Sequence, residues 1–295
     1  MEMINVFEFE WFKANPLDST SASGADPFSF PDGEFWYETF YHRIITSLRL
    51  SEEKDIQSRD LLSTLLNQRH TPLRNDLSVY SERIAGSTAL LAGAGPSIEP
   101  DISGLHDTIL DFTPFVIAAD GATDALLKAG IKPDLIVTDL DSASEESLVQ
   151  QSNVGTGVVV HAHGDNMQLI TRIVPKLGGN LFGSTQVKPL SNVCNVGGFT
   201  DGDRSCYLLA RFEPKKIIIA GMDFGSREGE YSRSRAIPPP TLVSDFKRIK
   251  LNWGKASLEA LIERHPEIRF VNVTKRGEEI KGATRMDYTS LRKEF

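Results

Sequence analysis

From Ser87 onward, short apolar runs rich in Val and Ile alternate with stretches of helical patterning, and this alternation constrains the fold most strongly. The runs are STALLAGAG, FVIAADGA, DLIVTDLDS, GVVVHAHGDN and KIIIAGMDFG, and between most of them lie stretches such as TDALLKAG and DRSCYLLARF. Strands that alternate with helices predict βαβ units and a mainly parallel sheet. Because the runs are apolar on both faces, we expect an α/β fold with helices flanking the sheet on both sides.

The chain before Ser87 predicts a small helical N-terminal domain over residues 1–85. Residues 34–80 place apolar side chains at helical spacing, such as Leu61, Leu62 and Leu65, whereas residues 1–30 look like loops. The α/β domain is predicted over 86–235, and a helix (242–264) and a strand (269–274) within 236–295 complete it. The Pro-rich stretch 230–240 is expected to be a surface loop, a linker to the C-terminal helix or a mobile lid, and the sequence leaves open whether residues 226–240 form a lid.

Composition narrows the possible partners and the location. The net charge is −8 and the pI is about 5.4, which disfavours a nucleic-acid or anionic-membrane binder and favours small-molecule partners. The N-terminus lacks the basic and apolar regions of a signal peptide, and no apolar stretch approaches the roughly 18 residues of a membrane-spanning helix. Only Cys194 and Cys206 are present, so we expect a reducing cytoplasm and structural cysteines.

Polar, glycine-containing motifs follow nearly every predicted strand. They are GAGPS (93–97), AADGA (118–122), TDLDS (138–142), HAHGDN (161–166) and NVGGFTDGDR (195–204). In an open parallel sheet the carboxyl ends of the strands share one edge, and ligands bind outside that edge. Five such motifs in series therefore predict one binding cleft.

The GAGPS motif predicts a nucleotide site of an unfamiliar kind. Its glycines allow backbone N–H groups to approach an anion closely. It is not the dinucleotide fingerprint, because Ile98 stands at the third glycine position, and it lacks the Gly-Lys-Ser/Thr ending of a P-loop. A tight strand-to-helix turn is the alternative interpretation.

Asp139 and Asp141 stand two positions apart at the end of an apolar run, where their charges repel. A shared divalent cation offsets this repulsion, and Mg²⁺ prefers oxygen ligands together with water and substrate phosphates. The alternative is that Asp141 or Ser142 caps the following helix, which leaves Asp139 unexplained.

Further polar residues have open roles at the neighbouring strand ends. Asp120 and Asp165 can complete the metal site, act as a base or bind a ribose, and His161 and His163 fit packing or hydrogen bonding beside the cleft. Asp201, Asp203 and Arg204 fit a capped turn, or Arg204 either holds phosphate oxygens or pairs with the neighbouring aspartates. On the tail helix Lys247, Arg248 and Lys250 either reach phosphates or form a solvated face.

Taken together, GAGPS, ADGA, PDLIVTDLDS, HAHGDN and GGFTDGDR resemble the archaeal 6-hydroxymethyl-7,8-dihydropterin pyrophosphokinases, which are distantly similar to thiamin pyrophosphokinases. HAHGDN together with GFTDGDR is the specific part of the resemblance. It implies an ATP- and Mg²⁺-dependent transfer in pterin biosynthesis of the tetrahydromethanopterin or folate type. The hydroxymethyl oxygen attacks the β-phosphorus of ATP, and AMP leaves.

The resemblance also implies roles for individual residues. Asp139, Asp141 and Asp165 are the expected catalytic residues and metal ligands, and Asp165 can also orient or deprotonate the attacking hydroxyl. The expected nucleotide-binding residues are Gly93, Ala94, Gly95, Pro96, Ser97, Asp120, Gly121 and Asn166. The expected substrate-binding residues are Gly198, Phe199, Thr200, Asp201 and Arg204, with Asp201 on the amino-pyrimidine edge of the pterin.

Two other functions compete with this one. A nucleotide-sugar-dependent glycosyltransferase related to flagellin glycosylation factors shares the region around GAGPS and can use a D-x-D pair for a metal. A non-catalytic nucleotide sensor is less consistent with so many acidic residues in the cleft. The sequence leaves open a homodimer and the role of the helical N-terminal region.

Overall fold

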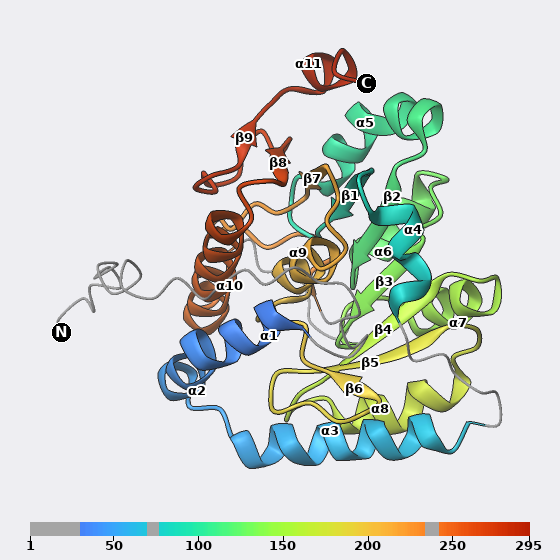
Figure 1. Ribbon diagram of the computed structural model, residues 1–295, viewed down its shortest axis with the longest axis vertical. Coiled ribbons are helices and arrows are strands. Elements are labelled where there is room, and N and C mark those ends of the chain that lie inside the picture. The colour runs from blue at the N-terminus through green and yellow to red at the C-terminus, as the bar shows by residue number, and fades with distance from the viewer. Residues whose placement is uncertain (1–29, 70–76, 234–241) are drawn as a thin grey trace, which may run out of the picture.

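A computed structural model describes residues 30–69, 77–233 and 242–295, and a nine-stranded sheet forms its centre (Figure 1). All strand pairs in this sheet are parallel, and the spatial order is β6-β5-β4-β3-β2-β1-β7-β8-β9. The strands are β1 (Thr88–Ala92), β2 (Phe115–Ala119), β3 (Leu135–Thr138), β4 (Gly157–Ala162), β5 (Leu181–Thr185), β6 (Val193–Cys194), β7 (Lys216–Ala220), β8 (Arg269–Asn272) and β9 (Thr284–Arg285). The predicted α/β class with a mainly parallel sheet is confirmed.

The direction in which strands are added reverses beside β1. From β1 to β6 the chain adds strands on one side, and β7 then returns to pair with the other side of β1. In α/β sheets ligands bind in the crevice at such a switch point, outside the carboxyl ends of the strands. The loops after β1 and β7 therefore flank the expected binding position.

The strands form because their side chains are apolar on both faces. Within β1, Ala89 and Leu91 belong to one core cluster and Leu90 and Ala92 to the other, as the two-residue period of a strand requires. The two clusters lie on opposite faces of the sheet, so strands of this composition are stable only when helices cover both faces.

Helices cover both faces of the sheet. They are α1 (Pro31–Trp36), η2 (Tyr37–Tyr41), α2 (His42–Leu48), α3 (Glu52–Asn67), η3 (Leu77–Tyr80), α4 (Ser81–Ile84), α5 (Ile98–Phe112), α6 (Ala122–Lys128), α7 (Glu145–Asn153), α8 (Met167–Ile173), η4 (Val174–Lys176), α9 (Asp201–Ala210), α10 (Asp245–Arg264) and α11 (Tyr288–Arg292). On one face α9 contacts β1, β2 and β3, and α10 packs behind it (Figure 1). On the other face lie α5, α6 and α7.

The predicted N-terminal helical region is present, and it shares a core with the sheet. Trp36, Tyr41 and Ile44 are fully buried in the same cluster as the inward residues of β1 and α9. Helix α3 runs along β4, β5 and α8 at the opposite end of the molecule from α11 (Figure 1). The division into domains stays a prediction, and the loop prediction for 1–29 lies outside the described residues, as does most of the Pro-rich part of 226–240.

Some secondary-structure elements were predicted from the sequence and others were not. The five runs and the strand over 269–274 are strands, and the tail helix begins at Asp245 within its predicted range. The elements β5, β6, β9 and α11 were not predicted from the sequence, and the helix α5 after GAGPS was implied only by the alternative of a strand-to-helix turn. The run LFGST in β5 contains a central glycine, and β6 and β9 have two residues each, so none carries a clear periodic signal. Within the described residues, no helix is long and apolar enough to cross a membrane.

A charged contact joins α1 to the end of α10 and gives a pH-dependent prediction. His265 Nε2 lies 2.9 Å from Asp32 Oδ2, and Nδ1 lies 2.7 Å from Glu267 Oε1. Burial alone lowers the pKa of His265, but the two carboxylates outweigh it and raise the pKa above its ordinary value. A raised histidine pKa stabilises the fold at low pH, and this contribution disappears as the pH rises through the folded-state pKa.

We therefore expect His265→Gln to reduce the free energy of unfolding by about 1 kcal/mol at pH 6 and by much less at pH 9. Urea unfolding at the two pH values measures this difference. His106→Gln is the matched control, because His106 is more exposed and lies 3.6 Å from Asp107. Equal losses at both pH values for His265→Gln would contradict the assignment.

Candidate functional site

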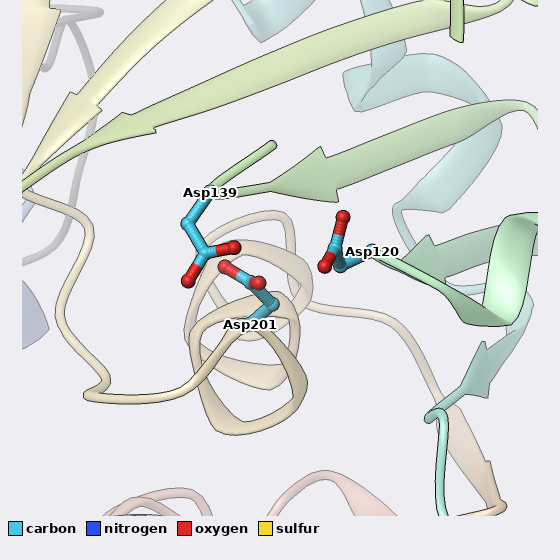
Figure 2. Close-up of side chains that lie close together, drawn as sticks. All are labelled: Asp120, Asp139 and Asp201. Atoms are coloured by element: carbon cyan, nitrogen blue, oxygen red, sulfur yellow. The ribbon is translucent and has the colours of Figure 1, made fainter. Parts of the chain in front are cut away.

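Three carboxylates meet at the carboxyl edge of the sheet. Asp120 follows β2, Asp139 follows β3 and Asp201 begins α9, and Figure 2 shows their side chains pointing toward one another. One oxygen from each carboxylate lies within 4.8 Å of the others. The sequence motifs ADGA, TDLDS and FTDGDR are therefore joined in space, as the strand-end argument predicted.

The side chain of Asp120 holds the TDLDS loop in place. The Asp120 carboxylate accepts hydrogen bonds from the Thr138 hydroxyl at 2.6 Å and from the backbone N–H groups of Ser142 and Ala143 at 3.0 and 3.2 Å. Asp120 itself has a φ of 43°, in the left-handed region. Such conformations cost free energy and persist where surrounding contacts fix them, often at functional sites.

Asp139 is held from two directions after β3 ends at Thr138. The next residue, Leu140, has a φ of 73°, so the strand turns there and Asp139 and Asp141 do not continue one strand face. His163 Nε2 lies 3.5 Å from Asp139 Oδ2, and Asn166 Nδ2 donates to the Asp139 carbonyl oxygen at 2.9 Å. The loops after β3 and β4 are thereby tied together.

Asp201 reaches the cluster because a capping box surrounds it. Thr200 is the N-cap of α9, and its N–H donates to Asp203 Oδ1 at 2.7 Å. The Asp203 carboxylate is thus used in capping, whereas Asp201 at the first helical position remains available to face the cleft. Gly198 permits this geometry, because a Cβ there would lie 2.5 Å from the Arg204 backbone nitrogen.

The electrostatics of the cluster show excess negative charge. Burial and repulsion by Asp139 raise the pKa values of the Asp120 and Asp201 carboxyls well above their ordinary value. For Asp139, burial alone raises the pKa, but the hydrogen bond with His163 and the charge of Lys250 lower it well below its ordinary value. Burial alone lowers the pKa of Lys250, and the charges of Asp139, Asp141 and Asp201 together raise it.

The three carboxylates fit a divalent cation. Mg²⁺ and Ca²⁺ prefer oxygen ligands at roughly 2.0–2.6 Å, so ligand atoms on opposite sides of one ion lie about 4–5 Å apart. The spacing in the cluster meets this requirement. A bound cation also compensates the repulsion that raises the pKa values of Asp120 and Asp201.

The cluster lies between two clefts. The first, of about 180 Å³, is lined by the GAGP turn after β1, by the DG turn after β2 and by residues 221–225 and 227–229 after β7. It sits at the switch point between β1 and β7. The second, of about 260 Å³, is lined by residues 49–51, 54–55 and 163–165, and by His161, Gln186 and Phe199. Asp139, Asp201 and Lys250 line both clefts.

Most of the predicted site residues line one of these clefts. In the first are Gly93, Ala94, Gly95, Pro96, Asp120, Gly121, Asp141, Thr200 and Lys247. In the second are Asp165, Phe199, His161 and His163. Asp141 and Asp165 are exposed and stand outside the group of three close carboxylates, so their role as metal ligands stays a prediction.

Other predicted residues lie behind the clefts and support them. The Ser97 hydroxyl donates to Asp101 and Asp223 at 2.8 and 3.0 Å. Asn166 is 2% exposed, and its amide nitrogen donates to the carbonyl oxygens of Asp139 and His161. Arg204 is fully buried and donates to the carbonyl oxygens of Gly197 and Phe199, so it stabilises the GGFTD loop from inside. Gly198 is buried within that loop.

The sequence reading missed two groups of residues that line the clefts. The segment GMDFGSREG (221–229) follows β7 as the other motifs follow their strands, so the same strand-end signal indicates it. Residues 49–51, 54 and 55, around the start of α3, line the second cleft, although they are far from the motifs in sequence. A long-range contact of this kind leaves no local pattern in one sequence.

Comparisons with known proteins agree on a family. The model of the family described as 6-hydroxymethylpterin diphosphokinase MptE-like matches residues 62–229. The 6-hydroxymethyl-7,8-dihydropterin pyrophosphokinase of Methanocaldococcus jannaschii is 37% identical over 80% of this chain and 98% of its own length. The enzymes of the same name from Methanothermobacter thermautotrophicus and Pyrococcus furiosus are 37% and 36% identical over 78% and 76% of this chain, and over 95% and 92% of their own lengths.

One solved structure shares the fold. The MAf glycosyltransferase from Magnetospirillum magneticum AMB-1 matches 81% of this chain with a TM-score of 0.53 and 17% identity. The match spans only 38% of that longer protein. At this identity the likeness concerns the fold alone.

Proposed function

The chain belongs to the family of MptE-like 6-hydroxymethylpterin diphosphokinases, and on that premise we propose that it transfers pyrophosphate from Mg²⁺-bound ATP to 6-hydroxymethyl-7,8-dihydropterin, releasing AMP. The pyrophosphokinase activity follows from the family. The use of ATP, the metal and the roles of the residues are our proposals. The observation that carries them is the arrangement of two clefts that meet at Asp139, Asp201 and Lys250.

The first cleft suits the nucleotide. Its glycines are required by close packing, since a Cβ on Gly95 would lie 2.5 Å from the Gly221 carbonyl oxygen, and one on Gly121 would meet the Tyr231 carbonyl oxygen. Backbone turns of this kind let an anionic ligand approach N–H groups closely. Lys247 and Lys250 line the cleft from α10 and supply positive charge for phosphates. We place the ATP triphosphate across this cleft, with its β-phosphate toward Asp139.

The reaction needs positioning and charge neutralisation more than covalent catalysis. A bond forms between the hydroxymethyl oxygen and the β-phosphorus, and the bond from that phosphorus to the oxygen of the α-phosphate breaks, so AMP leaves. A magnesium ion held by Asp120, Asp139 and Asp201 would supply positive charge to the transferred phosphates. Lys250 contributes a fixed positive charge from the protein. Asp165 lines the second cleft and is our candidate to accept the hydroxyl proton.

A product analysis tests this function. Purified protein is incubated with ATP, Mg²⁺ and 6-hydroxymethyl-7,8-dihydropterin, and the nucleotide products are separated. We expect AMP to form in proportion to the pterin, and EDTA to abolish its formation by removing the divalent cation. Formation of ADP, or no turnover that depends on the pterin, would contradict the proposal.

The other predicted properties remain open to experiment. The likeness to the MAf enzyme concerns only the fold and therefore does not support a glycosyltransferase activity. Hydrolysis of a nucleotide sugar by the purified protein would support that hypothesis. The predicted small-molecule substrates are consistent with the activity of the enzyme family. A cytoplasmic location, a homodimer and the absence of nucleic-acid partners stay predictions.

A further inference from the structure

The second cleft contains a buried polar atom without a partner. His161 is 2% exposed and lines this cleft. Its Nδ1 lies 3.1 Å from the Ser184 hydroxyl, but its Nε2 has no hydrogen-bond partner among the described residues. Buried polar groups are nearly always satisfied, so an isolated ring nitrogen in a cleft indicates a missing ligand.

The imidazole of His161 is also held in position. Its ring stacks on that of His163, with centroids 5.8 Å apart and an interplanar angle of 25°. The backbone carbonyl oxygen of His161 accepts a hydrogen bond from Asn166 Nδ2 at 2.7 Å. Burial and the charge of Arg204 lower the pKa of His161 well below its ordinary value, so the ring is neutral near pH 7. A neutral ring nitrogen donates or accepts one hydrogen bond.

The N-terminal helical region forms the opposite wall of this cleft. Asp55 on α3 is 2% exposed and accepts hydrogen bonds from Gly164 N–H at 2.7 Å and from Tyr41 and Gln186, each at 2.8 Å. These bonds fix the start of α3 against the HAHGD loop. The approach is close enough that a Cβ on Gly164 would lie 2.6 Å from Lys54 Cβ.

The lining of the cleft fits a planar, polar heterocycle. The aromatic side chains of Phe199 and Phe246 line it, and Phe246 is 51% exposed, so it offers an apolar surface for a flat ring to cover. Asp55 accepts three hydrogen bonds from described residues, whereas a carboxylate has about four acceptor positions. A pterin presents ring N–H, amino and carbonyl groups that match both Asp55 and His161.

We propose that the second cleft holds the pterin, that His161 Nε2 hydrogen-bonds to its ring, and that Ser51, Lys54 and Asp55 of the N-terminal region set the specificity for this acceptor. This inference rests on the proposed function. The hydroxymethyl group then points to the shared edge at Asp139, Asp201 and Lys250, toward the nucleotide in the first cleft. The N-terminal helices thus complete the acceptor site as well as the core.

Two variants test the assignment, with matched controls. His161→Phe removes the ring nitrogen, and His161→Gln restores a polar group near the same position. Lys54→Trp narrows the cleft from the exposed surface of α3, whereas Glu53→Trp places the same bulk on an exposed neighbour that does not line the cleft. Thermal unfolding identifies the variants that remain folded. If His161→Phe does not fold, the pterin affinity of Lys54→Trp tests the assignment.

The readouts are KM for each substrate and calorimetric titration of 6-hydroxymethyl-7,8-dihydropterin without nucleotide. We expect His161→Phe and Lys54→Trp to weaken pterin binding by about tenfold, with KM for ATP within about twofold of the unmodified protein. His161→Gln should recover most of the affinity, and Glu53→Trp should bind normally.

Unchanged pterin affinity in folded His161→Phe or Lys54→Trp protein would overturn the inference, even if the enzyme makes AMP normally. Conversely, the unmodified protein could form no pterin-dependent AMP while these variants still lose pterin binding. That result would support the assignment of the second cleft to the pterin and contradict the proposed reaction. The two hypotheses are therefore separable.

Discussion

Replacing Asp139 by Asn is expected to lower kcat for pterin-dependent AMP formation by about a hundredfold or more while the protein stays folded. Asp139, like Asp201, lines both clefts and belongs to the three-carboxylate group, and the pKa of Asp139 is held well below its ordinary value despite burial. The amide keeps the size of the side chain but removes the charge that the cation requires.

The control for this prediction is Asp245→Asn, since Asp245 is an exposed carboxylate in the first turn of α10. Steady-state kinetics with saturating ATP and pterin measures kcat for each variant. Asp141→Asn and Asp165→Asn, measured in parallel, test the sequence-based assignment of these residues. Near-normal turnover in Asp139→Asn would remove Asp139 from the metal site.

Replacing Asp101 by Ala is expected to reduce the free energy of unfolding by about 3 kcal/mol or more, because buried hydrogen-bonding groups lose their acceptor. Asp101 is 1% exposed, and its Oδ2 accepts hydrogen bonds from Ser97, from the Gly221 N–H and from Thr274, at 2.8, 2.9 and 3.2 Å. Its Oδ1 accepts one from Tyr288 at 2.7 Å. One carboxylate therefore joins the turns after β1, β7 and β8.

Urea unfolding measures this loss, and Asp107→Ala is the matched control on the same helix. Asp107 is 75% exposed and pairs with Arg292 at 3.4 Å, so its replacement should change stability by only about 0.5 kcal/mol. We also expect Asp101→Asn to lose less than Asp101→Ala, because the amide retains an acceptor oxygen. A loss for Asp101→Ala as small as that of Asp107→Ala would show that the turns hold together without this carboxylate.

The sheet could be predicted from the sequence because its strands carry a strong local signal. Runs such as TALLA and KIIIA are apolar on both faces, which in a parallel sheet means burial beneath two layers of helices. The topology then places the ends of β2 and β3 side by side, so Asp120 and Asp139 meet without any further assumption. The edge strands β6 and β9 are too short to show a period.

The composition of the carboxylate group was harder to predict. Alternate positions such as 139 and 141 lie on one face of a continuing strand, but Leu140 adopts a positive φ and turns the chain between Asp139 and Asp141. Asp201 joins the group because Asp203 serves as the capping residue, a division of roles that depends on where α9 begins. Such choices are decided by backbone geometry at single residues, which sequence periodicity does not report.

The second cleft shows the limit of sequence reasoning more clearly. Asp55 hydrogen-bonds with Gln186 and Gly164, which lie more than a hundred positions away in the sequence. Nothing in the segment EEKDIQSRD distinguishes this stretch from a solvent-exposed helix. Arg204 showed the converse: its charge suggested a phosphate contact, whereas the structure buries it against the carbonyl oxygens of Gly197 and Phe199. Long-range contacts decide the role of Asp55, and burial within its own loop decides that of Arg204.

We propose that two clefts meeting at Asp139 allow a pyrophosphoryl group to pass from ATP to the pterin. Transfer of label from ATP tests it most directly, with radioactive phosphorus placed at the β position in one sample and at the γ position in another. We predict that both labels appear on the pterin in equal amounts, with unlabelled AMP as the partner product. Transfer of the γ label alone, with labelled ADP left from the β sample, would contradict the account.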